Sequence, residues 1–383
     1  MRDVCLLAWR SLSFHWLRNA LLIGSLATAL FVPAVVYVLV QRAAESLRER
    51  ADSTPLVLGA AGSDTDLTLM SLYFAGRSAT PISVGDVDAI DPQLATVLPL
   101  HVRFHARGRP VVGVTPDYFQ HRGLTLSSGD AWQRSGDCLL GHQVAAELAL
   151  RAGDRLTTDS ETVFDLAGNY PLRMRVTGVL AATGTADDLA VFVALETAWI
   201  LEGIGHGHTS AGEAGTESGD QPHSTAKPFT EVTEENAGSF HFHGRRAGFP
   251  LTSALVLPRD ERAQTLLLGK YESREASSLQ LAEPDEVMQR LLGAVLKARW
   301  FVIVGMTLLG LSAFALVVLV FGLTFRLRRG EFQTLRRIGA SARRLAAIVA
   351  CECVAVIVAS ASLAAVLTWT ATLFEPYLLR WLL

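Results

Sequence analysis

The sequence predicts an integral membrane protein: an α-helical bundle of three transmembrane helices with a large α+β extracytoplasmic domain on a two-helix stalk. Three stretches with at most one charged residue indicate the spans, at residues 19–41, 300–325 and 345–374. Each stretch reaches the length of about 20 apolar residues that a helix needs to cross a bilayer. Residues 42–299, between the first two spans, have the mixed composition of a folded domain.

Arginine predicts the orientation of the chain in the membrane. Residues 1–18 hold three arginines against one acidic residue, and residues 326–344 hold seven against one. Short basic segments remain in the cytoplasm. Residues 42–299 hold 23 Lys or Arg against 33 Asp or Glu, a net charge of −10, so this domain is expected outside. Nothing in the charge pattern indicates nucleic-acid binding.

Helical patterns extend beyond the three spans. Residues 1–18 predict an amphipathic helix at the cytoplasmic interface. Pro284 suits a first helical turn, and the run to Phe325 would make a helix of about 60 Å. The hydrocarbon core needs only about 30 Å. Residues 284–299 and 41–51 are therefore expected to pair outside the membrane as the stalk.

Within the external domain, Val- and Leu-rich segments predict strands at 56–58, 110–114, 174–180, 189–194 and 252–257. Helices are predicted at 84–90, 142–150 and 259–268. Residues 203–248 are rich in Gly, Ser, Thr, Glu and His, which is typical of a flexible insert. Cys138, the only cysteine outside the membrane, is expected to be a buried free thiol.

Five segments, considered together in their order along the chain, resemble a known protein family. They are LAWRSLSFHWLRNALL (7–22), VVGVTPDYF (111–119), LLGHQVAAELALRAGD (139–154), VTGVLAATGTADDLAVFVAL (176–195) and RRGEFQTLRRIGAS (328–341). Their order and spacing resemble the MacB/FtsX-type permeases of the ABC transporter superfamily. The resemblance implies a MacB-like periplasmic core domain, an FtsX-like transmembrane domain and a bacterial inner-membrane location with a cytoplasmic N-terminus.

The resemblance also implies mechanotransmission, in which ATP hydrolysis in the cytoplasm moves the external domain. No phosphate-binding loop is present, since the only Gly-Lys pair is followed by Tyr271. We find no catalytic motif either, so the chain is not predicted to be an enzyme. The implied partners are a separate ATPase subunit, a second permease copy in a homodimer or heterodimer, and a periplasmic binding or adaptor protein.

Six residues of the cytoplasmic segment 326–344 are candidates for coupling to the ATPase: Glu331, Phe332, Leu335, Arg336, Ile338 and Gly339. Among them Phe332, Leu335 and Ile338 form an apolar stripe at helical spacing, which favours docking into a groove. The alternative is a basic loop that only obeys the positive-inside rule.

Five of the ten histidines lie in the insert: His206, His208, His223, His241 and His243. Two His-x-His pairs would each present two imidazoles on one side of an extended chain. Imidazole suits zinc or copper, so the insert is a candidate metal site. The alternative is a solvated loop that binds no metal.

Three further features leave alternatives open. The family usually has four spans, and only residues 375–383 follow the third stretch, so the chain is either a three-span form with its C-terminus outside or truncated. Glu352 in the third span is interpreted as an interfacial carboxylate paired with Arg344, with an ion-coupling site as the alternative. Asp187 and Asp188 are expected to cap a turn before a strand.

The leading function is therefore a permease subunit of an ABC complex, linked to transition-metal or envelope substrate traffic. A non-transporting FtsX-like regulator of an envelope enzyme is one alternative. A membrane-anchored metal-binding receptor without an ATPase is another.

Overall fold

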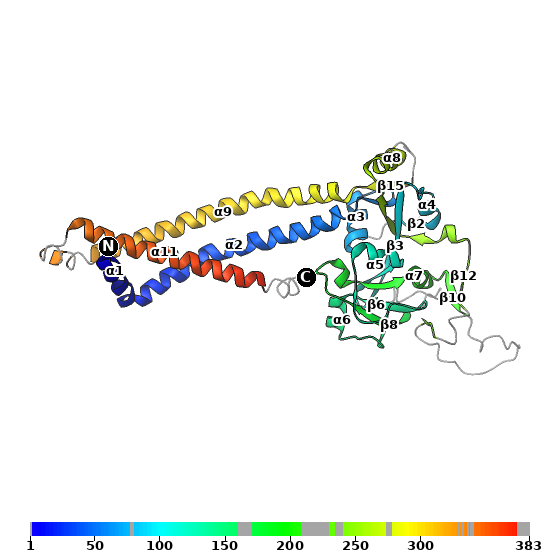
Figure 1. Cartoon of the computed structure of the whole chain (residues 1–383), viewed down its shortest axis with the longest axis horizontal. Helices are drawn as coiled ribbons and strands as arrows, with labels where there is room; N and C mark the ends of the chain where they lie inside the picture. The colour runs from blue at the N-terminus through cyan, green and yellow to red at the C-terminus, as the bar shows by residue number, and fades with distance from the viewer. Residues whose placement is uncertain are drawn as a thin grey trace, which may run out of the picture. The chain divides into compact units, whose positions relative to one another are not determined.

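The computed structural model describes residues 2–76, 80–159, 171–207, 230–233, 240–272, 278–327, 330, 333–334, 337 and 341–373. The chain divides into two compact units. The membrane unit comprises Met1–Glu45 and Leu291–Leu383, and the core domain comprises Ser46–Arg290. Helices α2 and α9 each contribute residues to both units (Figure 1).

The core domain is built on a mixed sheet that has eleven strands among the described residues. Nine follow the order β11-β8-β6-β9-β4-β3-β14-β1-β15, and β5 and β7 both pair with β8. These strands are β1 (Leu56–Ala60), β3 (Ala95–Ala106), β4 (Arg109–Val114), β5 (Leu126–Gly129), β6 (Asp137–Leu140), β7 (Arg155–Thr157), β8 (Leu172–Leu180), β9 (Val191–Ala194), β11 (Thr230–Glu231), β14 (Ser253–Pro258) and β15 (Leu279–Ala282). Two small sheets pair β10 (Gly205–Gly207) with β12 (Phe240–Phe242) and β13 (Pro250–Leu251) with β2 (Ile82–Ser83).

Strands β3 and β4 form a tight hairpin near the middle of the sheet. The two residues between them, Arg107 and Gly108, have φ values of 50° and 74°. A two-residue hairpin turn needs this left-handed conformation. The Asp159 carboxylate accepts hydrogen bonds from both backbone N–H groups, at 2.8 Å each. The turn therefore fixes the register of the pair, in which Ala106 faces Arg109.

Short helices cover both faces of the sheet: α3 (Asp64–Tyr73), α4 (Val84–Asp88), α5 (Pro116–Arg122), α6 (His142–Leu148), α7 (Leu195–Leu201), α8 (Glu261–Glu272) and the 3-10 helices η1 (Ala186–Leu189) and η3 (Arg246–Gly248). Successive strand residues alternate between the two faces. Val112 packs in a core cluster with Tyr118 of α5, whereas Val111 belongs to a cluster with Val144 of α6. A third cluster surrounds Trp199 of α7.

The membrane unit consists of long helices among its described residues: α1 (Arg2–Phe14), α2 (Trp16–Asp52), α9 (Pro284–Leu327) and α11 (Ala342–Leu373). In the described part of the chain, three helices are long and apolar enough to cross a membrane, at Trp16–Asp52, Ile303–Val320 and Arg343–Leu373. Leu22, Val317 and Val356 pack together in one cluster drawn from all three. The three predicted spans are thus confirmed by length and composition.

Most elements predicted from the sequence are present. The five predicted strands correspond to β1, β4, β8, β9 and β14, and the three short helices to α4, α6 and α8. The helix predicted from Pro284 is also confirmed. The longest strand, β3, was missed because Pro99 and several polar residues interrupt its apolar pattern.

Two boundaries differ from the predicted ones. The helix expected over 1–18 is interrupted at His15, because α1 ends at Phe14 and α2 begins at Trp16. Asn19 Nδ2 donates to the Leu12 carbonyl across this break, at 2.9 Å. The ends of the insert 203–248 also have regular structure, in β10, β11 and β12.

We expect Gly141→Ala to destabilise the core domain. A methyl group at Gly141, between β6 and α6, would lie 2.3 Å from the Asp187 carbonyl oxygen and 2.5 Å from that of Asp188. Relieving such a clash costs about 1–3 kcal/mol. Thermal unfolding of the purified full chain in detergent would measure the loss.

The control is Gly269→Ala in α8, where the new methyl group meets no atom within 4 Å. This change should stabilise α8 by up to about 1 kcal/mol through helix propensity. Equal melting temperatures for the Gly141 variant and the wild type would contradict the close contact between the α6 N-terminus and η1.

Candidate functional site

Helix α2 ends in the core domain with a buried arginine. Arg50 lies in its last turn and is 7% exposed. All three guanidinium nitrogens are bonded: Nε donates to the Leu72 carbonyl, Nη1 to Asp187, and Nη2 to Asp187 and Tyr118. Leu47 and Ala51, which share a helical face with Arg50, pack in the apolar cluster around Tyr118. Charge and apolar packing therefore hold the same face of α2.

Asp187 forms a bidentate salt bridge with Arg50. Nη1 lies 2.6 Å from Oδ2, and Nη2 lies 3.0 Å from Oδ1. The two side chains are only 6% and 2% exposed. Burial alone would raise the pKa of Asp187, but the hydrogen bond and charge of Arg50 bring that pKa below its ordinary value. The carboxylate therefore stays ionised and the pair is a buried salt bridge.

Tyr118 of α5 completes the cluster and is fully buried. Its hydroxyl donates to Asp187 Oδ1 at 2.8 Å and accepts from Arg50 Nη2 at 3.1 Å. Burial, followed by the nearby Asp187 charge, raises the pKa of Tyr118 above its ordinary value. The phenol thus remains a neutral hydrogen-bond donor.

A tight turn positions Asp187. Asp188 accepts hydrogen bonds from the backbone N–H groups of Thr183 and Gly184, at 3.0 and 2.8 Å. Thr185 Oγ1 donates to Asp187 Oδ2 at 3.0 Å. The predicted turn-capping role is confirmed for Asp188. The pairing of Asp187 with Arg50, 137 residues away in sequence, was not predicted.

Helix α5 also forms hydrogen bonds with the residues that follow α2. Arg122, in its last turn, donates from Nη1 to Ser53 Oγ and from Nη2 to Thr54 Oγ1, at 2.8 Å each. Burial lowers the pKa of Arg122. Tyr118 and Arg122, one turn apart on α5, therefore contact the end of α2 and the two residues after it.

The cluster of Arg50, Tyr118 and Asp187 anchors the end of α2 and contains no reactive group. Asp187 accepts from Arg50, Tyr118 and Thr185, so its oxygens are already engaged. Arg50 is bonded through all three nitrogens, and Tyr118 is protonated. No side chain of the cluster is left to act as nucleophile or general base.

The family model of the MacB-like periplasmic core domain matches residues 21–228, more than half of the chain. The chain belongs to this family. The match includes the Arg50 cluster and most of the core domain. Residues 229–383, with the second and third apolar helices, lie beyond it, so the FtsX-like character of the membrane unit stays a prediction.

Several solved structures are similar to this chain at low sequence identity. The periplasmic region of MacB from Actinobacillus actinomycetemcomitans is 12% identical, covering 64% of this chain and 97% of that chain, with a TM-score of 0.35. The extracellular domain of the ABC-type transporter YknZ from Gram-positive bacteria is 11% identical, covering 59% and 98%, with a TM-score of 0.31. No curated protein matches. At these TM-scores the two structures do not by themselves define the fold.

The residues proposed to couple this MacB-like chain to an ATPase lie outside the described residues. They are Glu331, Phe332, Leu335, Arg336, Ile338 and Gly339. The C-terminal tail 375–383 also lies outside them. The docking interpretation of 326–344 therefore stays a prediction.

The candidate metal ligands are only partly described. His208 and His223 lie outside the described residues. His206 and His241 are register partners in the β10–β12 pair, and the rings of His241 and His243 lie 4.7 Å apart between centroids. The described part of the chain contains no group of three His, Cys, Asp or Glu side chains that could hold a metal ion. Metal binding by the insert stays a prediction.

Two other residues noted in the sequence are buried. Cys138 in β6 is a free cysteine with no exposed surface, as predicted. Burial raises the pKa of its thiol, so it is not a reactive thiolate. Glu352 in α11 is 3% exposed, and its role in the membrane unit stays a prediction.

We expect Asp187→Asn to destabilise the core domain by about 3–5 kcal/mol, because it leaves the Arg50 charge buried without compensation. The apolar triple variant Arg50→Met, Tyr118→Phe, Asp187→Leu should recover most of that loss. Chemical denaturation of the purified full chain, followed by tryptophan fluorescence, would measure both.

Arg109→Met is the matched control. Arg109 pairs with Glu147, and both side chains are about one-third exposed. Such a pair contributes no more than about 1 kcal/mol. If Asp187→Asn cost no more than this control, the cluster would not be the buried salt bridge described here.

Proposed function

We propose that this chain is the permease subunit of an ABC transporter complex. In it, ATP hydrolysis by a separate cytoplasmic subunit moves the MacB-like core domain. The observation that carries the proposal is the unbroken helix α2, which runs from an apolar membrane-spanning stretch to the buried Arg50 cluster. A helix fixed by directional bonds to α3, α5 and η1 of the core domain can transmit a displacement to that domain.

The orientation follows from the arginine distribution. Residues 1–18 and 326–344 lie in the cytoplasm, and the core domain lies in the periplasm of a bacterial inner membrane. Families of this type work with two permease copies, so a homodimer or heterodimer with two ATPase subunits is the expected assembly. The chain itself carries no phosphate-binding loop in its sequence.

Leu335→Asp should abolish binding of the ATPase subunit. If 326–344 docks as a helix, the new carboxylate is buried at the interface without a partner, which costs several kcal/mol. The permease would be co-expressed with a candidate ABC ATPase subunit and purified by an affinity tag. Loss of the ATPase from the eluate, with normal membrane insertion, is the expected result.

Gln333→Asp is the control, because it adds the same charge outside the Phe332–Leu335–Ile338 stripe. It should retain the ATPase. Equal retention by both variants would favour the basic-loop alternative, and absence of any ATPase from wild-type preparations would favour the membrane-anchored receptor.

The His-rich insert supports a second, separable proposal: that the complex handles zinc or copper. Half of the chain's histidines lie in 46 residues, among acidic side chains. Neutral imidazole is the metal-binding form, so affinity should fall as the pH drops through about 6.5.

Zinc titration of the full chain should show binding at about pH 7.5 that weakens at about pH 5.5. A variant with all five insert histidines changed to glutamine should lose it, whereas His105→Gln should not. Identical titrations of the two variants would place any zinc elsewhere and leave the insert without a metal role.

A further inference from the structure

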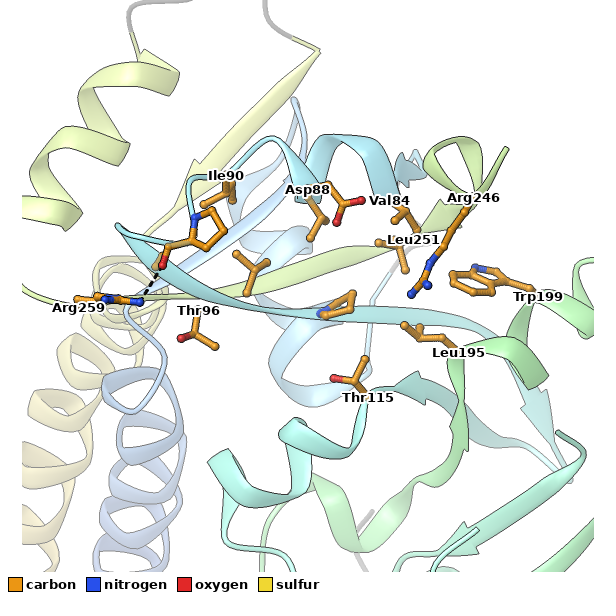
Figure 2. A pocket seen from close by; sticks show the side chains of 15 residues that line it. Val84, Asp88, Ile90, Thr96, Thr115, Leu195, Trp199, Arg246, Leu251 and Arg259 are labelled. Atoms are coloured by element: carbon orange, nitrogen blue, oxygen red, sulfur yellow. Dashed lines mark hydrogen bonds between the residues drawn. The ribbon is translucent and has the colours of Figure 1, made fainter. Parts of the chain in front are cut away.

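A groove of about 660 Å³ lies on the core domain beside β3 (Figure 2). This volume falls within the range of about 300–1,000 Å³ that small-molecule sites occupy. Apolar side chains from α4, β3, α7 and β13 line it: Val84, Val97, Pro99, Leu195, Trp199 and Leu251. Val97 and Pro99 are half-buried, and the other four are buried. All of these elements belong to the core domain.

Two arginines lie at opposite ends of the groove in Figure 2. Arg259 Nη2 donates to the Pro92 carbonyl at 3.0 Å. Arg246 of η3 extends toward Trp199 and Leu195. Its guanidinium makes no hydrogen bond or ion pair with any residue that the structure describes.

The groove is therefore locally positive within an acidic domain. It contains two guanidinium groups and one carboxylate, that of Asp88 on the rim. Residues 42–299 as a whole carry a net charge of −10. A cationic end beside apolar side chains selects a ligand with an anionic head and an apolar body.

Thr115 adds an unsatisfied hydroxyl to the same groove. Its Oγ1 is buried and has no hydrogen-bond partner among the described residues. Although Thr115 is the N-cap residue of α5, its side chain makes no capping bond. Buried hydroxyls are normally bonded, so a ligand oxygen or an ordered water is expected there.

We propose that this groove binds a single-chain fatty acid, with the carboxylate at Arg246 and the acyl chain along Val97 and Pro99 of β3. Guanidinium and carboxylate form two parallel hydrogen bonds, and the apolar side chains remove the acyl chain from water. The site requires no ATPase, so this inference stands whether or not the proposed transport complex exists.

The test is photo-crosslinking of the full chain in phosphatidylcholine discs by a decanoate analogue with a diazirine in its chain. Mass spectrometry separates labelled groove peptides from labelled membrane helices. We expect label on the peptide that contains Val97 and Pro99, competed by decanoate and not by decanol. Arg246→Met should reduce groove label at least about tenfold, the effect of losing a charge-assisted hydrogen bond.

Arg245→Met is the matched control, because Arg245 is exposed and does not line the groove. It should leave the label unchanged. Val97→Trp, which fills the groove and leaves Arg246 in place, should also abolish label, with circular dichroism confirming a folded chain. Label confined to membrane helices, equal competition by decanol, or equal label in the Arg245 and Arg246 variants would each overturn the proposal.

Discussion

The buried pair of Arg50 and Asp187 sets the geometry on which the core domain depends. A guanidinium removed from water loses several kcal/mol of hydration, which is recovered only if its donors are all satisfied. Here Leu72, Asp187 and Tyr118 supply the acceptors. Each bond has a direction, so together they fix both the rotation and the height of the last turn of α2. Apolar contacts such as that of Ala51 stabilise the same turn, but they do not define its position as strictly, because they have no preferred direction.

Helix α5 connects this pair to the groove. Thr115 at its N-terminus lines the groove, Tyr118 bonds Arg50 and Asp187, and Arg122 holds Ser53 and Thr54. A shift of this short helix would therefore change both the groove and the Arg50–Asp187 pair. Allosteric coupling needs an element that two sites can bias, and α5 meets that structural condition. Phe119 of α5 packs in the same core cluster as Ala51.

Features that depend on local sequence pattern were predicted from the sequence. The length of the apolar stretches predicted the three spans, and Val-rich segments predicted β4, β8 and β9. The missed features depend on distant partners. Strand β3 is stabilised by pairing with β4 and β14 despite Pro99, and Asp187 pairs with Arg50 from 137 residues away in the sequence. One local signal did exist: Arg50 shares a helical face with Leu47 and Ala51, an unfavourable place for an unpaired charge.

The two long helices are held differently in the core domain. At the start of α9, Val287 and Met288 are buried, and Met288 belongs to the same cluster as Ala51. The ion pair of Arg290 with Asp64 is largely exposed and adds little. Apolar burial is non-directional, whereas the hydrogen bonds of Arg50 have defined directions, so different kinds of contact hold the two helix ends. The end of α2 is therefore more strictly positioned in the core domain than the start of α9.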